Sequence, residues 1–252
     1  MITKKTYDNV QLKIYETRAE MGQDAAKDAA ACIKACLAEK EEINCIFAAA
    51  PSQNDFLAAL VADTSIDWSR INGYHMDDYV GFAQGDSRSF NGFLQNAIFG
   101  KVPFKSLHLI NGLAEPEAEA LRYEKLLQEN PTDIVFMGIG ENGHIAFNDP
   151  SVADFNDAHL VKVVTLEESC RRQQVNDGCF ATIDDVPKQA LTVTVPGLMR
   201  AAHLFCIVPT ALKANAVAKA LTGPIDESCP SSILRTQKGA RMYIDAAAAA
   251  KL

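Results

Sequence analysis

Short apolar segments alternate with amphipathic ones along this chain, and this alternation constrains the fold more than any other feature. Residues 16–41 carry Ala25 and Ala29 at helical spacing, and the uniformly apolar run INCIFAAA follows at residues 43–50. A strand that is apolar throughout is typical of a parallel sheet covered on both faces. The alternation therefore predicts an α/β fold with a Rossmann-like, mostly parallel sheet and helices on both faces, that is, a three-layer sandwich.

The same order repeats almost to the end of the chain. We expect a strand and its exit loop at residues 71–80, and further strands at 106–110, 133–139, 160–164, 190–195, 203–208 and 240–245. Further helices are expected at 56–63, 89–99, 115–129 and 211–223. The last helix ends at Gly223 with Pro224 behind it, a common helix stop. No linker or internal repeat interrupts the pattern, so we expect residues 1–252 to form a single domain.

The composition is that of a globular protein whose partners are neither nucleic acids nor membranes. Hydrophobic residues make up 48% of the chain, and the formal net charge of -8 opposes binding to phosphate-rich surfaces. No apolar run reaches the roughly 18 residues needed to cross a bilayer. The N-terminal residues also lack the apolar segment of a signal peptide. We therefore expect a cytoplasmic protein that acts on a small molecule.

The seven cysteines do not suggest a disulfide framework, because their number is odd and they are scattered over helices, strands and loops. Cys32 and Cys36 share a helix face, but no second Cys or His pair stands near them in the sequence to complete a zinc site. We therefore expect buried, inert thiols and no metal.

Candidate ligand-binding loops follow from the fold class. In open α/β sheets, ligands bind beyond the carboxyl ends of the strands, near the point where strand order reverses. The search therefore narrows to residues 49–55, 75–82, 138–150 and 209–213.

The loop at residues 138–150 reads GIGENGHIAFNDP and is the most informative stretch. Gly138, Gly140 and Gly143 permit tight turns and a close approach of the backbone to a ligand. His144 is flanked by carboxylates, which suits proton transfer near neutral pH. The stretch is not a dinucleotide-binding fingerprint, because the third glycine is misplaced and His144 stands where the helix should open.

The loop at residues 75–82 reads HMDDYVGF and contributes two adjacent carboxylates, Asp77 and Asp78. Their side chains project in different directions. One could therefore face the ligand as a base while the other holds the loop through backbone hydrogen bonds.

Taken together, these loops resemble those of the glucosamine-6-phosphate deaminases and the related galactosamine-6-phosphate isomerases. HMDDYVGF resembles the family's MDEYVG motif, and GIGENGHIAFNDP resembles its GxGxxGHIAFNEP motif. A third stretch, DDVPKQALTVTVPGLMRA, resembles the family's VPxxALTxGxxxLxxA. The resemblance runs from residue 16 almost to the C-terminus, and it implies the deaminase/isomerase-type sandwich.

The resemblance also implies an activity, the aldose–ketose isomerisation and deamination of an amino sugar phosphate of gluco or galacto type, without a cofactor. Asp77 would carry a proton between C2 and C1 of the open-chain sugar through an enediol or enolamine intermediate. His144 would assist ring opening. Asp149 occupies the family's glutamate position with an arm one methylene shorter, and Asn142 would orient His144 by hydrogen bonding.

The expected phosphate loop departs from the family pattern. Members usually have a TGGTP-like loop whose amides and hydroxyl bind phosphate, whereas the matching stretch here is AAPSQND. Pro51 removes an amide donor and Asp55 adds a negative charge, although Ser52 matches the family's threonine and Lys213 its phosphate lysine. Either a rebuilt site binds the phosphate, or the substrate carries another group there. We expect substrate contacts from Ser52, Gln53, Asp78, Gly138, Gly140, Gly143 and Lys213.

Two other functions remain open. A 6-phosphogluconolactonase-like hydrolase shares the implied fold and could use His144 as a base, although the HIAFNDP and MDDYVG segments favour the isomerase or deaminase. The second is a non-catalytic sugar sensor. Such proteins commonly carry a DNA-binding domain, and this chain has neither an added helix-turn-helix segment nor a basic patch. A homo-oligomer is also compatible with the resemblance.

Overall fold

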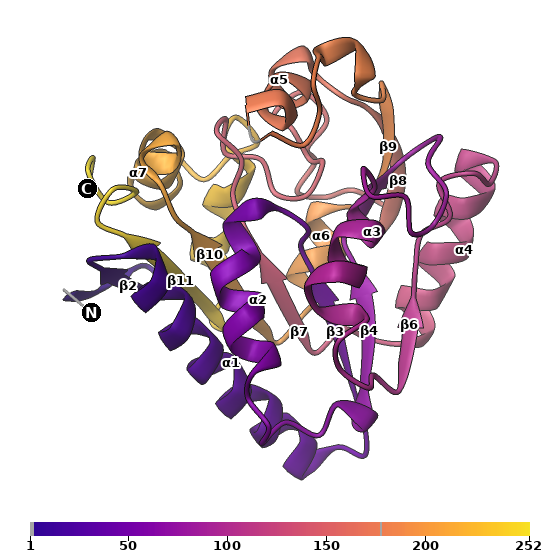
Figure 1. The fold of residues 1–252 in the computed structure, drawn as a ribbon. Coiled ribbons are helices and arrows are strands. Elements are labelled where there is room, and N and C mark those ends of the chain that lie inside the picture. The colour runs from indigo at the N-terminus through magenta and orange to yellow at the C-terminus, as the bar shows by residue number, and fades with distance from the viewer. Residues whose placement is uncertain (1–2, 177) are drawn as a thin grey trace.

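A large, mostly parallel sheet forms the centre of the molecule (Figure 1). The computed structural model describes residues 3–176 and 178–252, and among these residues eight strands form the sheet in the order β1-β2-β11-β10-β7-β3-β4-β6. Its strands are β1 (Thr3–Tyr7), β2 (Val10–Tyr15), β3 (Ile43–Phe47), β4 (Ile71–His75), β6 (Ser106–His108), β7 (Ile134–Met137), β10 (His203–Val208) and β11 (Ala240–Asp245). Neighbouring strands are parallel except for the antiparallel pair β1 and β2. The predicted α/β fold is thus confirmed. The β1–β2 hairpin was not predicted, and the side chains of β1 are partly or fully exposed, so no apolar run marks that strand.

Helices cover both faces of this sheet (Figure 1). They are α1 (Arg18–Glu39), α2 (Asn54–Val61), α3 (Phe90–Leu94), α4 (Pro116–Glu129), α5 (Glu168–Asn176), α6 (Val195–Met199) and α7 (Ala214–Thr222). Successive strand residues point to opposite faces, so Phe47 and Phe136 pack with α1 and α2, whereas Ile46 and Val135 pack with α4, α6 and α7. This two-sided burial explains why the central strands are apolar throughout.

A second, smaller sheet is antiparallel and has the order β5-β9-β8. It consists of β5 (Asp77–Tyr79), β8 (Val161–Thr165) and β9 (Gln189–Val193). The strand expected at residues 71–80 is therefore divided between two sheets. Met76 stands at the division, since its N–H donates to the Phe47 carbonyl at 3.4 Å and its carbonyl accepts from the Val193 N–H at 2.7 Å.

Strand order reverses between β3 and β7. After β3 the chain continues to β4 and β6 on one side, and after β7 it continues to β10 and β11 on the other. The loops that follow β3 and β7 diverge for this reason, which opens a crevice at the carboxyl ends of the strands. None of the helices in the described ranges is both long enough and apolar enough to cross a membrane.

Replacing Phe136 by Ala should lower the free energy of unfolding by about 3–5 kcal/mol. Phe136 is 1% exposed on β7, and its ring contacts the rings of Phe47, Phe56 and Phe205. Urea denaturation followed by circular dichroism measures the change. The control is Leu121→Ala on α4, whose side chain is exposed and whose loss should cost no more than about 0.5 kcal/mol. Equal losses for the two variants would contradict this description of the core.

Candidate functional site

A cavity of about 190 Å³ opens at the carboxyl ends of β3, β4, β7 and β10. A cavity that holds one buried water needs only about 10–15 Å³, so this much larger cavity has room for a small sugar. The sequence-predicted residues that line it are Ser52, Gln53, Asp77, Gly138, Gly140, His144 and Lys213. Asp78, Asn142, Gly143 and Asp149, also predicted, lie behind this wall.

Asp77 begins β5 and is buried in the cavity wall, where it pairs in register with Thr192 of β9. Burial raises the pKa of its carboxyl well above the ordinary value, and the charge of neighbouring Asp78 raises it further. A carboxylate with a raised pKa is a stronger base than an exposed one, so it suits the removal of a proton from carbon.

Asp78 was predicted to contact substrate, but it is not among the residues that line the cavity. Its carboxylate accepts hydrogen bonds from the backbone N–H groups of Tyr79, Phe90 and Asn91 and from the Asn91 side chain, at 2.7–3.0 Å. Asp78 therefore anchors the start of α3 to β5. The alternating directions of side chains along a strand separate the two neighbouring carboxylates in this way.

His75 fixes the backbone of Asp77, a role that the sequence did not reveal. The Ile110 N–H donates to Nε2 of His75 at 2.9 Å, so Nδ1 carries the proton and donates to the Asp77 carbonyl at 2.9 Å. Burial lowers the pKa of His75, which favours this neutral form. The Ile110 amide comes from a distant loop, and no sequence motif indicates it.

His144 is held by Asn142 and Asp149. Its Nδ1 lies 2.8 Å from Asn142 Oδ1 and 3.1 Å from Asp149 Oδ1, while Asn142 Nδ2 donates to Asp149 at 2.8 Å. Both neighbours of Nδ1 are acceptors, so Nδ1 carries a proton and Nε2 is the proton-accepting atom of the neutral ring. The shorter carboxylate arm of Asp149 still reaches the imidazole.

Asp149 keeps its negative charge although it is 1% exposed. Burial alone would raise its pKa, but hydrogen bonds from His144, Asn142 and the Cys170 thiol, with the charge of His144, leave the pKa below its ordinary value. Cys170 belongs to α5 and was not predicted as part of the site. The donor atoms of His144, Asp149 and Cys170 lie within 4.8 Å of one another. These three residues form a group of possible metal ligands beside the cavity. Asp149 already accepts hydrogen bonds from the other two.

The glycines of the loop make room for neighbouring side chains. A Cβ on Gly140 would lie 2.1–2.3 Å from three atoms of the His144 ring, so only glycine allows the imidazole to pack there. Gly143 has a φ of +89°, and a Cβ on it would lie 2.6 Å from the Cys229 sulfur. Gly143 thus shapes the loop, and it is not among the residues that line the cavity.

The AAPSQND loop is built differently from a glycine-rich phosphate loop. Pro51 opens a short 3₁₀ turn, Pro51–Gln53, directly before α2. Gln53 donates from Nε2 to Ser52 Oγ and to the Ile207 carbonyl of β10, both at 3.1 Å. The side chain of Gln53 therefore connects the turn to the neighbouring strand. In a glycine-rich phosphate loop, tight glycine turns would give the loop its shape instead.

Arg18 supplies the positive charge that the sequence did not indicate at this loop. It begins α1, lines the cavity, and its guanidinium binds the carboxylate of Asp55 and the carbonyl of Pro51. Arg18 and Asp55 are distant in sequence, so no motif connects them. The charge of Asp55 is thus paired. Arg171 and Arg172 do not line the cavity. Arg171 donates hydrogen bonds to backbone carbonyls, and Arg172 donates one to the Glu168 carboxylate.

Lys213 is buried and lines the same cavity, at the end of the 3₁₀ turn Ala211–Lys213 that leads into α7. The residue before this turn, Thr210, has a φ of +85°, which is unfavourable for a β-branched side chain. Its N–H donates to both carboxylate oxygens of Asp245 at 3.1 Å. Such backbone strain persists where the surroundings hold it, and it is common at functional sites.

Comparison with known proteins shows which family the chain resembles. The family of glucosamine-6-phosphate isomerases and 6-phosphogluconolactonases matches residues 16–243. The chain is 36% identical over 188 residues to a glucosamine-6-phosphate deaminase of Streptococcus pyogenes serotype M49, covering 74% of this chain and 78% of that protein. It is 34% identical over 212 residues to one of Listeria welshimeri serovar 6b, covering 84% and 88%.

Solved structures show the same relationship. A monomeric glucosamine-6-phosphate deaminase is 31% identical, with a TM-score of 0.86, and the match covers 96% of this chain and 99% of that one. The 6-phosphogluconolactonase of Trypanosoma brucei is 15% identical, with a TM-score of 0.78, and the match covers 99% and 100%. The second likeness is one of fold alone.

Asp77→Asn should raise the free energy of unfolding at neutral pH, whereas Asp78→Asn should lower it. Below about pH 3.8 both states hold the Asp77 proton. Above it the unfolded chain releases that proton, whereas the folded state releases it only at higher pH because its pKa is raised. This carboxyl therefore destabilises the fold increasingly as pH rises toward the folded-state pKa. Asparagine has no such dependence.

Asp78→Asn instead weakens charge-assisted hydrogen bonds, at a cost of about 1.5–3 kcal/mol. Urea denaturation of both variants at pH 4 and pH 7 tests the pair. A stability gain for Asp77→Asn that shrinks between pH 4 and pH 7 would contradict the inferred burial of that carboxyl.

Proposed function

This chain belongs to the family of glucosamine-6-phosphate isomerases and 6-phosphogluconolactonases, and we propose that it isomerises and deaminates an amino sugar 6-phosphate. One observation supports this proposal most strongly. Asp77 and His144, which are far apart in sequence, line the same cavity. An acid–base pair at one sugar-sized cavity is what an aldose–ketose conversion needs. The named relatives in the family are deaminases of this kind.

Ring opening is the role proposed for His144. Its Nδ1 is engaged by Asn142 and Asp149, so Nε2 can accept the proton of the anomeric hydroxyl and return it to the ring oxygen. The negative charge of Asp149 stabilises the imidazolium that forms in between. Asn142 and Asp149 therefore act as positioning residues behind the imidazole.

Isomerisation is the role proposed for Asp77. Its carboxylate removes the proton from C2 of the open-chain sugar and delivers it to C1, through an enolamine with a double bond between C1 and C2. The C2 imine that results adds water and releases ammonia, which leaves the ketose phosphate. Burial supports this role, since it makes the carboxylate more basic.

The phosphate is assigned to the end of the cavity lined by Ser52, Arg18 and Lys213. Gln53 holds the Ser52 turn against Ile207, close to the loop that carries Lys213. Arg18 neutralises Asp55, which removes the main objection to a dianion at this loop. We place this reaction in the cytoplasm, which the free state of all seven cysteines supports.

The activity itself is tested with a panel of amino and hydroxy sugars, each with and without a 6-phosphate. Ammonia release and exchange of the C2 proton with solvent are measured together. Hydrolysis of 6-phosphogluconolactone forms a separate arm of the panel. Lactone hydrolysis without ammonia release from any amino sugar would overturn the proposal in favour of the hydrolase.

Asp77→Asn should reduce C2 proton exchange by about 10²-fold to 10⁴-fold, the contribution typical of a positioned acid–base group. Proton exchange is measured by NMR in deuterated water, and sugar binding by calorimetry. Binding should be largely retained, because asparagine has the same size. The matched control is Asp86→Asn, at an exposed turn outside the cavity wall. Unchanged exchange in Asp77→Asn would eliminate the proposed role.

Lys213→Ala should raise the KM for phosphorylated substrates roughly tenfold to hundredfold and affect neutral sugars much less. A hydrogen bond to a charged group contributes about 1.5–3 kcal/mol, which corresponds to that range. The control is Lys251→Ala, since Lys251 bonds to Asn215 outside the cavity wall. Equal losses for phosphorylated and neutral sugars would show that Lys213 does not bind phosphate.

A further inference from the structure

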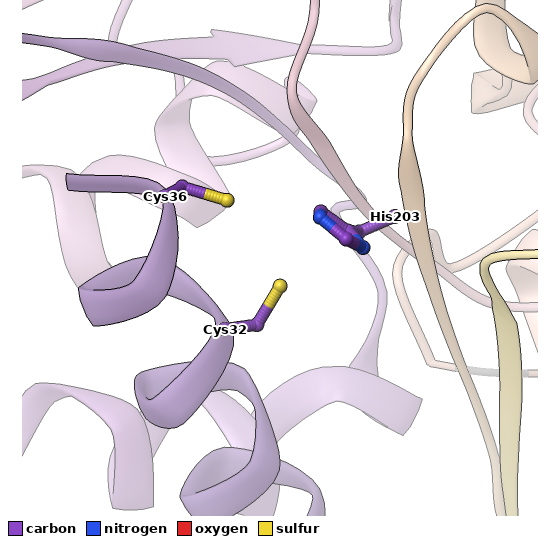
Figure 2. A group of neighbouring side chains, drawn as sticks. All are labelled: Cys32, Cys36 and His203. Atoms are coloured by element: carbon purple, nitrogen blue, oxygen red, sulfur yellow. The ribbon is translucent and has the colours of Figure 1, made fainter. Parts of the chain in front are cut away.

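Two cysteines and a histidine lie side by side at the opposite end of the sheet from the active-site cavity. Figure 2 shows the thiols of Cys32 and Cys36 projecting from one face of α1 toward the imidazole of His203. Their donor atoms lie within 4.8 Å of one another, and all three side chains are partly exposed. The sequence shows no second Cys or His pair near these cysteines, and the structure instead brings a single histidine to them. His203 is distant in sequence and is brought there by the packing of α1 on β10.

We propose that Cys32, Cys36 and His203 form a binding site for a thiophilic divalent cation, of which Zn²⁺ is the fitting biological example. Two thiolates and one imidazole are the ligand types that zinc prefers, and they would balance its charge. Sulfur ligands of a tetrahedral zinc lie about 3.8 Å apart, as the Zn–S bond of about 2.3 Å requires. A separation below 4.8 Å thus needs only small side-chain rotations.

The surroundings of the three residues support a ligand site. Cys32 and His203 border a second cavity of about 420 Å³, through which a cation and a fourth ligand such as water can enter. Burial raises the pKa of the Cys32 thiol to about 12, and the charge of Arg241, which borders the same cavity, offsets only part of this rise. A bound cation would therefore have to displace the thiol proton. The His203 N–H is held by the Asp133 carbonyl at 3.1 Å, which fixes the backbone that carries the imidazole.

The position of the cluster distinguishes it from the catalytic site. His203 is the first residue of β10, whereas the loop with Lys213 follows the other end of this strand. Likewise Cys32 and Cys36 lie in the second half of α1, whereas Arg18 begins it. A bound cation would therefore fasten α1 to β10; Arg18 begins α1, and the loop with Lys213 follows the far end of β10. The proposed cation would therefore stabilise the packing of α1 on β10 and would not contact the substrate.

Cobalt substitution tests the proposal on the whole reduced protein after treatment with a chelator. Co²⁺ is added, and the sulfur-to-cobalt charge-transfer band is recorded. Zn²⁺ is then titrated against it. We expect a band with tetrahedral cobalt absorption that Zn²⁺ abolishes. Loss of a residue that only supports a metal ligand typically weakens metal affinity by about tenfold to hundredfold. Cys32→Ser, Cys36→Ser and His203→Gln each remove a ligand, so each should weaken the affinity for Co²⁺ by at least that factor.

Two controls separate this site from the other cysteines. Cys179→Ser removes a partly exposed thiol elsewhere, and Cys170→Ser removes the thiol next to His144 and Asp149. Both variants should retain the band. Zn²⁺ should also raise the melting temperature of the unmodified protein but not that of Cys36→Ser, because a ligand of the native state stabilises it. The proposal is overturned if the unmodified protein gives no charge-transfer band, or if the band disappears only in Cys170→Ser.

Discussion

The chain passes from the large sheet to the small one at Met76, and the catalytic arrangement depends on this crossing. The N–H of Met76 bonds to Phe47 of β3, and its carbonyl bonds to Val193 of β9. One residue is thus fixed to both sheets, and the next, Asp77, is held at their junction. The crevice where the strand order reverses lies at the same place. A buried carboxylate is therefore presented to a ligand by backbone hydrogen bonds alone, with no flexible loop between.

The burial of Asp77 is unfavourable, and the residues next to it, rather than Asp77, make the hydrogen bonds that hold this part of the fold. Burial and the charge of Asp78 both raise the pKa of Asp77, so its charged form is destabilised. Asp78 receives the hydrogen bonds that anchor α3, and neutral His75 holds the Asp77 carbonyl. The carboxyl of Asp77 is thus left for chemistry. In the proposed mechanism, stability and activity therefore depend on different residues of one strand.

Much of this molecule could be predicted from its sequence, because local patterns determine it. The apolar runs gave the central strands and the alternation gave the parallel sheet, whereas residues 160–164 and 190–195 were expected as strands without any sign that they form a separate sheet. Register and sheet membership depend on partners distant in the chain. The same reason explains the contributions of Arg18, His75 and Cys170, which become visible only when distant segments meet.

The AAPSQND loop shows how a changed sequence can keep a similar electrostatic task. A glycine-rich loop binds an anion with backbone amides, and Pro51 removes one of these donors here. The structure instead brings the guanidinium of Arg18 against Pro51 and Asp55. An ion pair as exposed as this one contributes little to stability, so its main effect is on charge. It cancels the charge of the Asp55 carboxylate at a loop that borders the cavity.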